Sequence, residues 1–285
     1  MTSTTRDWEV DNLGGGVYVF RWRTGFYSSP FFVTPDGVCA VDPIDDHAAS
    51  AYRTAISTVT DAPVVAIVYT HDHRDHACGA RVLSEDAEVI AHPQAAERIV
   101  RRAAGDIRIP TRLVADEEVL VFGGVSIRTK YFGPNHSDSN IALFADTDGG
   151  RLLVFSDVIE PGVAPYRDLA DSDLAGIVST LDALEEEQFD IVMGGHLGPG
   201  ERSWAEDYRA YFHELIDISA QEFASMGGQK PLPGEDGVQM TERVRNETCA
   251  RVAERLRPRY GHWPGFKQWA PMNANRTLSY LITGN

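Results

Sequence analysis

The strongest constraint on this chain is the segment 70–76, which reads Thr-His-Asp-His-Arg-Asp-His. It directly follows residues 64–69, an apolar run with the length and composition of a buried strand. Because side chains alternate between the two faces of an extended segment, the first two histidines point the same way, and the following turn redirects the next two donors. Imidazole and carboxylate groups at this density are typical of a metal site, with zinc the usual ion and iron or manganese the alternatives. The predicted donors here are His71, His73, Asp75 and His76.

Other donors stand where further apolar runs end, which is where strands should stop. His136 lies in a Gly-Pro-Asn-His-Ser loop, and Asp157 follows the run 152–155. His196 comes after the run 189–193 and two glycines, which let a backbone crowd a site. Asp42 follows the run 38–41. Each alone is typical of a turn or cap residue, but together they supply enough ligands for two adjacent ions.

With these residues, the chain resembles the metallo-β-lactamase-fold hydrolases, and in particular their dinuclear branch, which includes glyoxalase II and the metallo-lactonases. The five motifs of that superfamily occur in the expected order over roughly residues 15–200. The resemblance implies a first metal held by His71, His73 and His136, and a second held by Asp75, His76 and His196. It also implies that Asp157 bridges both ions and that the buried Asp42 orients the ligand loop.

Departures from the superfamily's motif pattern argue against several of its branches. Asp157 stands where the commonest zinc β-lactamases have a cysteine, and no obvious lysine follows to bind a β-lactam carboxylate, which disfavours antibiotic hydrolysis. His73 stands where flavodiiron reductases have a glutamate, and the chain has no flavodoxin-like segment. The nuclease insert and basic surface of the RNA-processing branch are also missing from the sequence.

Composition limits the partners. Lys and Arg total 26 against 42 Asp and Glu, a net charge of −16 that repels a phosphate backbone, so we expect no nucleic-acid partner. No apolar stretch has membrane-spanning length and the N-terminus is polar, which predicts a cytoplasmic protein without a membrane partner. Three cysteines without a CxxC pair fit a reducing compartment, and Cys78 is expected to pack rather than to bind metal.

Strand and helix patterns alternate up to about residue 200, which indicates a layered α/β architecture. The resemblance adds that this domain, residues 1–200, is an αββα metallo-β-lactamase sandwich. Residues 201–285 are predicted to be a helical, aromatic-rich appendage, with helices near 203–225 and 240–255 around a Gly/Pro-rich breaker. Two interpretations of its aromatics stand: they pack the appendage or form a homodimer surface, or they close a lid over an apolar pocket. The candidate substrate contacts are Tyr166, Trp263, Trp269 and Asn273.

The predicted function is a dinuclear zinc hydrolase acting on a small metabolite or xenobiotic. A hydroxide shared by two cations would attack an ester, lactone, thioester or amide bond, with Asp75 as a general acid and Asp42 as a positioning group. An iron-dependent persulfide dioxygenase of the same fold is the alternative, and the complete second ligand set argues against it. A non-catalytic binding module is the third interpretation, and the full set of donors disfavours it.

Overall fold

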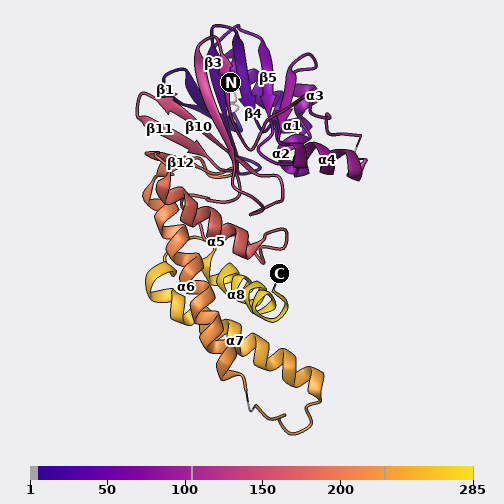
Figure 1. Cartoon of the computed structure of the whole chain (residues 1–285), viewed down its shortest axis with the longest axis vertical. Coiled ribbons are helices and arrows are strands. Elements are labelled where there is room, and N and C mark those ends of the chain that lie inside the picture. The colour runs from indigo at the N-terminus through magenta and orange to yellow at the C-terminus, as the bar shows by residue number, and fades with distance from the viewer. Residues whose placement is uncertain (1–5, 104, 228, 285) are drawn as a thin grey trace, which may run out of the picture. The chain divides into compact units, whose positions relative to one another are not determined.

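The structure, a computed structural model, describes residues 6–103, 105–227 and 229–284, which fall into two compact units. The first unit comprises Met1–Pro161 and Glu186–Arg202, and the second comprises Gly162–Glu185 and Ser203–Asn285. All the strands described below belong to the first unit, whereas the second is helical (Figure 1).

The first sheet contains seven strands in chain order, from β1 to β7. Neighbours from β1 to β4 are antiparallel, and neighbours from β4 to β7 are parallel. The tight turn at Pro35-Asp36 connects β3 to β4. The strand bounds are β1 Trp8–Gly14, β2 Val17–Trp22, β3 Tyr27–Thr34, β4 Gly37–Val41, β5 Val64–Val68, β6 Glu88–Ala91 and β7 Arg112–Leu113.

The second sheet contains six strands in the order β13-β12-β11-β10-β9-β8. Its neighbours are antiparallel except for β11 and β12, which run parallel. A tight turn at Asp148-Gly149 joins β10 to β11. The strand bounds are β8 Glu117–Phe122, β9 Val125–Tyr131, β10 Ile141–Thr147, β11 Gly150–Val154, β12 Ile191–Met193 and β13 Pro199–Glu201.

The first sheet is buried on both faces, as its β4 strand illustrates. Val38 and Ala40 join an apolar cluster with the helices on one face, whereas Cys39 and Val41 join a second cluster that contains side chains of the other sheet. Alternation along the strand therefore separates two cores, one between helices and sheet and one between the two sheets. The helices of this unit are α1 Asp46–Ser57, α2 Arg74–Ala77, α3 Ala80–Leu83 and α4 Pro93–Arg102 (Figure 1).

The parallel strand pairs bring distant segments to a common edge. Strands β4 and β5 are parallel neighbours, as are β11 and β12, so the residues after each pair emerge together. Asp42 follows β4 and the segment 70–76 follows β5. Asp157 and His196 lie just beyond β11 and β12. The topology thus places at strand ends the residues that the sequence singles out, where an open α/β sheet usually presents its site.

The second unit contains α5 Leu174–Ala183, α6 Ser203–Ser225, α7 Gly237–Tyr260 and α8 Phe266–Thr283, and a short 3₁₀ helix, η1 Leu184–Glu186, spans the boundary. An aromatic cluster joins three of its segments: Tyr211 and Tyr260 have ring centroids 5.0 Å apart, and Tyr260 and Trp263 are 4.9 Å apart. The predicted helical, aromatic-rich character of residues 201–285 is confirmed. No helix in the described part of the chain is long and apolar enough to cross a membrane.

Three features differ from the expected pattern. Helix α7 begins earlier than residue 240, because Asp236 and Gln239 form a reciprocal capping box at its start. The sequence pattern does not indicate α8, which carries Pro271 inside it. Residues 162–185 group with the C-terminal helices rather than with residues 1–161, since the Asn273 amide donates to the carbonyls of Pro165 and Arg167 at 3.2 and 2.5 Å.

Replacing Phe20 with alanine should destabilise the first unit. Phe20 is fully buried, and its ring stacks on Tyr52 at 4.6 Å between centroids. We expect the free energy of unfolding to fall by about 3–5 kcal/mol, because the side chain leaves a cavity in a close-packed core. Urea denaturation followed by circular dichroism measures the change, with the exposed Val121→Ala as control. Equal unfolding midpoints for the two variants would contradict the packing described.

Candidate metal centre

The segment 70–76 joins strand β5 to helix α2 and changes direction within a few residues. His71 is fully buried, and Thr70 Oγ1 lies 3.0 Å from its Nδ1, so its Nε2 remains available on the other side of the ring. His73 precedes the first residue of α2, and Asp75 and His76 lie in that helix. The segment therefore presents two donors before the helix and two within it.

Loops from the second sheet deliver the other three donors. His136 lies between β9 and β10, Asp157 follows β11 with a left-handed φ of 65°, and His196 follows β12. Glycines are required before His196 because the backbone there passes close to other side chains of the centre. A Cβ on Gly195 would stand 2.6 Å from His76 Cε1 and 2.8 Å from Asp157 Oδ1. The two glycines thus allow the β12 loop to reach the other donors.

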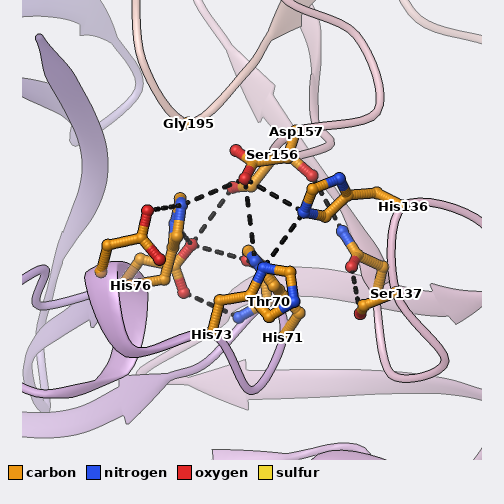
Figure 2. Close-up of polar contacts among 12 residues, drawn as sticks. Thr70, His71, His73, His76, His136, Ser137, Ser156, Asp157 and Gly195 are labelled. Carbon is orange, nitrogen blue, oxygen red and sulfur yellow. Dashed lines mark hydrogen bonds and ion pairs between the residues drawn. The ribbon is translucent and has the colours of Figure 1, made fainter. Parts of the chain in front are cut away.

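The carboxylate of Asp157 lies at the centre of the histidines (Figure 2). Its Oδ2 is 3.8, 3.4 and 3.3 Å from the Nε2 atoms of His71, His76 and His136, respectively. Its Oδ1 is 3.2 Å from His196 Nε2. One carboxylate therefore faces histidines of both implied groups through its two oxygens.

The structure brings all seven predicted donors together in two separate but neighbouring groups. In each group the potential ligand atoms lie within 4.8 Å of one another, as expected around one ion. The first group comprises His71, His73, His136 and Asp157, and the second comprises Asp75, His76 and His196.

Several atoms of the centre lack the partners that buried polar atoms normally have. Among the described residues, His71 Nε2, His76 Nε2 and Asp157 Oδ1 are buried without a hydrogen bond. In addition, His136 Nε2 and His73 Nδ1 lie 3.1 Å apart, where two lone pairs would repel unless a proton or a cation lies between them. Orphaned nitrogens and a central carboxylate are the donor set that a pair of divalent cations would satisfy.

The electrostatics of the centre favour the metal-binding protonation states of His71 and Asp157, whereas they favour the protonated, cationic form of His76. Burial and the neighbouring His76 hold the pKa of His71 well below its usual value, so its imidazole stays neutral. Burial alone would raise the pKa of Asp157, but His76 and His136 outweigh it and hold that pKa well below its usual value. Burial would also lower the pKa of His76, yet the carboxylates of Asp157 and Asp42 raise it. Neutral imidazole and ionised carboxylate are the ligating forms.

Asp42 connects the segments that carry these donors. Its Oδ1 accepts the backbone N–H of Thr70 at 2.8 Å, and its Oδ2 accepts the Thr70 hydroxyl at 2.6 Å and the Ser156 hydroxyl at 3.1 Å. The same Oδ2 lies 3.1 Å from His76 Nδ1, which leaves His76 Nε2 directed at Asp157. Asp42 makes the contacts expected of a residue that orients the ligand loop.

Glu160 is a buried residue of the centre that sequence reasoning did not identify individually. Its carboxylate accepts the backbone N–H groups of Gly195 at 2.6 Å, His196 at 3.2 Å and Asp157 at 3.3 Å, and burial raises its pKa. A Cβ on Gly194 would stand 2.3 Å from this carboxylate. Glu160 thus ties the Asp157 loop to the His196 loop. Its only sequence signal is a position three residues after Asp157.

Asp72 was also missed, although it lies between two predicted donors. It is fully buried, and its carboxylate accepts the Ser139 hydroxyl at 2.7 Å and pairs with Arg102 at 2.7 Å and Arg98 at 3.2 Å. Both arginines belong to helix α4, whereas Ser139 belongs to the loop that carries His136. Side-chain alternation gives the signal: Asp72 points away from the face that His71 and His73 share, toward a separate set of partners.

The four candidate substrate contacts all belong to the helical unit. Trp263 and Asn273 are buried there, Trp263 against Tyr260 and Asn273 by a 2.6 Å hydrogen bond from the Tyr211 hydroxyl. Tyr166 is 60% exposed and lies edge-on to Trp269. The packing interpretation accounts for Trp263 and Asn273 within their own unit. Substrate contact by any of the four stays a prediction.

Gly195→Ala should reduce metal binding without unfolding the chain. The added Cβ would push against His76 and Asp157, so we expect metal content per chain to fall by about half or more. Metal analysis of the purified variant by mass spectrometry, together with its circular dichroism spectrum, measures this. Gly105→Ala is the control, since nothing lies within 4 Å of a Cβ there. Wild-type metal content in the Gly195 variant would show that the close approach is unimportant.

Comparisons with known proteins agree with this geometry. The family model described as Metallo-beta-lactamase superfamily matches residues 47–196, a span that holds six of the seven donors in one stretch and ends on the seventh. The chain is 35% identical over 188 residues to the 2,4-dinitroanisole O-demethylase subunit alpha of Nocardioides sp. (strain JS1661), covering 65% of this chain and 55% of that protein. The chain thus spans about half the length of this curated relative.

Solved structures of low sequence identity share the fold. A metallo-beta-lactamase from Pontibacter korlensis matches with a TM-score of 0.63 at 18% identity, over 72% of this chain and 99% of that one. A metallo beta lactamase from Erythrobacter litoralis matches with a TM-score of 0.61 at 21% identity, over 74% of this chain and 98% of that one. With its paired sheets and the family match over half its length, the chain belongs to the metallo-β-lactamase superfamily and has that superfamily's sandwich fold.

Proposed function

We propose that this chain is a dinuclear metal-dependent hydrolase of a small metabolite or xenobiotic, with zinc as the native ion. The observation that carries the proposal is the convergence of seven donors into two groups, with the Asp157 carboxylate of the first group 3.4 and 3.2 Å from the Nε2 atoms of His76 and His196 in the second. When bound, two divalent cations supply Lewis acidity and a water whose pKa is lowered from about 15.7 toward about 7. Such a centre needs no serine or cysteine nucleophile, and the three cysteines are free thiols, with Cys39 and Cys249 buried.

The chain's own residues divide the work of such a site. His71, His73 and His136 would hold one ion and Asp75, His76 and His196 the other, while Asp157 would face both. Asp42 and Glu160 hold the backbone and rings in place from behind. Asp75 is the donor with the most open side chain, 51% exposed, so its carboxylate is placed to exchange a proton with a leaving group or with solvent.

Two classes of scissile bond are proposed for this site. The first is the carbonyl class, which comprises esters, lactones, thioesters and amides. The second is an activated aryl methyl ether, favoured by the 35% identity to the 2,4-dinitroanisole O-demethylase subunit. Its hydrolysis balances without an oxidant: ether and water give a phenol and methanol, with one proton moving from water to the leaving oxygen, which is methoxide for attack at the ring carbon and phenoxide for attack at the methyl carbon. Both reactions use the same activated water.

The complete second group supports hydrolysis over persulfide dioxygenation. A dioxygenase of this fold would use one iron, whereas Asp75, His76 and His196 offer a second set of ligand atoms close together. We further propose a cytoplasmic setting, in keeping with the three free thiols, and a homodimer formed through the helical unit. Gel filtration coupled to light scattering tests the dimer.

Metal analysis combined with a substrate panel tests the proposed function. We expect about two equivalents of divalent metal per chain, loss of turnover after chelation and recovery on adding zinc. The panel contains lactones, thioesters, aryl esters, amides, β-lactams, phosphodiesters and 2,4-dinitroanisole. In H₂¹⁸O, an ester should yield a labelled acid. Label in the phenol of the aryl ether places the attack at the ring carbon, and label in methanol places it at the methyl group.

Asp157→Asn is the decisive variant. Removing the shared charge should lower kcat/KM by about 100-fold or more, because both groups lose their common ligand. The matched control is Asp146→Asn, whose side chain is 76% exposed in strand β10. One iron equivalent with oxygen uptake would instead support the dioxygenase, and no turnover on the whole panel by metal-loaded protein would support a non-catalytic module.

A further inference from the structure

The hairpin of strands β2 and β3 lies against the second donor group. Three backbone or hydroxyl contacts join it to the His196 loop. The Ser28 N–H donates to the Gly195 carbonyl at 2.9 Å, and the Ser28 hydroxyl donates to the His196 carbonyl at 3.2 Å. The Phe26 carbonyl lies 3.1 Å from His196 Nδ1. A carbonyl there fixes the proton on Nδ1, so that the lone pair of His196 is on Nε2.

The residue between these contacts is Tyr27, the first residue of β3. Its hydroxyl donates to Asp75 Oδ2 at 2.9 Å, and its ring lies 4.5 Å from the His196 ring and 5.7 Å from the His76 ring. Tyr27 therefore touches every member of the second group. No member of the first group is among these contacts.

Asp75 needs such a partner more than the other donors do. The rings of His71, His76 and His196 are each held through their second nitrogen, by Thr70, Asp42 and the Phe26 carbonyl. The Asp75 carboxylate stands at the start of a short helix with a 51% exposed side chain. Within the described residues, the only hydrogen bond that another side chain donates to it comes from Tyr27. A free carboxylate at this position would lose rotational entropy on binding an ion, and the tyrosine removes that freedom beforehand.

The backbone before Tyr27 shows that this placement is enforced. Phe26 has a left-handed φ of 59°, which is rare for a bulky residue, and its side chain is 68% exposed. Because the Phe26 ring is exposed, its burial does not offset the strain of this turn. It does direct the Phe26 carbonyl at His196 and the Tyr27 side chain at Asp75, and backbone strain of this kind typically collects at functional sites.

We propose that Tyr27 is a positioning residue for the second metal: by hydrogen bonding to Asp75 and packing on His196, it preorganises the Asp75–His76–His196 group for a divalent cation. The inference rests on the proposed function insofar as that function uses two ions. It assigns a role to a strand outside the metal-binding motifs, in a hairpin that precedes residues 47–196 of the family match.

Tyr27→Phe tests this, because it removes one hydroxyl and keeps the ring beside His196. We expect the second equivalent of zinc to bind roughly 10- to 100-fold more weakly, with the first unchanged, in titrations against a competing chelator. The visible spectrum of the cobalt-substituted variant should match that of the wild type after the first equivalent and differ from it only after the second. Tyr18→Phe is the matched control, since Tyr18 lies on the adjacent strand and stacks on Phe31.

A double-variant cycle separates positioning from a general structural effect. If Tyr27 acts through Asp75, adding Tyr27→Phe to Asp75→Asn should weaken the second equivalent by less than twofold beyond Asp75→Asn alone. Melting temperatures of the metal-free variants should match the metal-free wild type. Unchanged binding of the second equivalent in Tyr27→Phe, equal losses in both backgrounds, or a wild type that takes up a single ion would each overturn the proposal.

The outcomes for this role and for the proposed function are distinct. Wild-type protein that binds two ions but turns over no substrate refutes the hydrolase and leaves the affinity comparison to decide on Tyr27. Active protein whose second ion binds equally well in Tyr27→Phe refutes the positioning role and leaves the hydrolase standing.

Discussion

The geometry of the centre depends on the hydrogen bonds of the buried Asp42 carboxylate. It follows β4 in the first sheet and hydrogen bonds to Thr70 after β5, to Ser156 after β11, and to the ring of His76. It thereby locks the ends of both sheets into one register. A buried charge is stable in such a place only when its hydrogen bonds are complete, and here several donors from separate segments satisfy it. Any slip of one sheet against the other would leave that charge unpaired.

Negative charge accumulates behind and within the centre. Asp75 and Asp157 belong to the donor groups, and Asp42 and Glu160 lie directly behind them. Four carboxylates at such close range repel one another unless protons or cations neutralise them. Two bound divalent cations would carry the compensating charge, and their binding would then stabilise the folded loops. The acidity of the whole chain adds a long-range field that attracts cations.

The sequence predicts the parts of this structure that local patterns encode. The segment 70–76, the apolar strands and the donors at their ends could be identified because strand alternation and metal chemistry both leave short, regular signatures. Glu160 and Tyr27 leave no such signature, since each acts through partners distant in the chain, such as Gly195 and Asp75. Alternation separates Asp72 from the donors but does not reveal its partner Arg102. Helix α8 was not predicted because Pro271 interrupts its apolar pattern. The grouping of residues 162–185 with the C-terminal helices depends on Asn273, which lies far downstream in the sequence.

The donors differ sharply in their access to solvent. In the first group the side chains of His71, Asp157 and His136 are 0%, 12% and 18% exposed, whereas in the second group those of His196 and Asp75 are 30% and 51% exposed and that of His76 is 1% exposed. The first ion would be enclosed, while the second ion would exchange with solvent past the exposed Asp75 side chain. The cell's free metal supply would then set how many chains carry a full complement at any moment. A chain with this arrangement would lose the second ion first as divalent cations become scarce, before the enclosed first ion leaves.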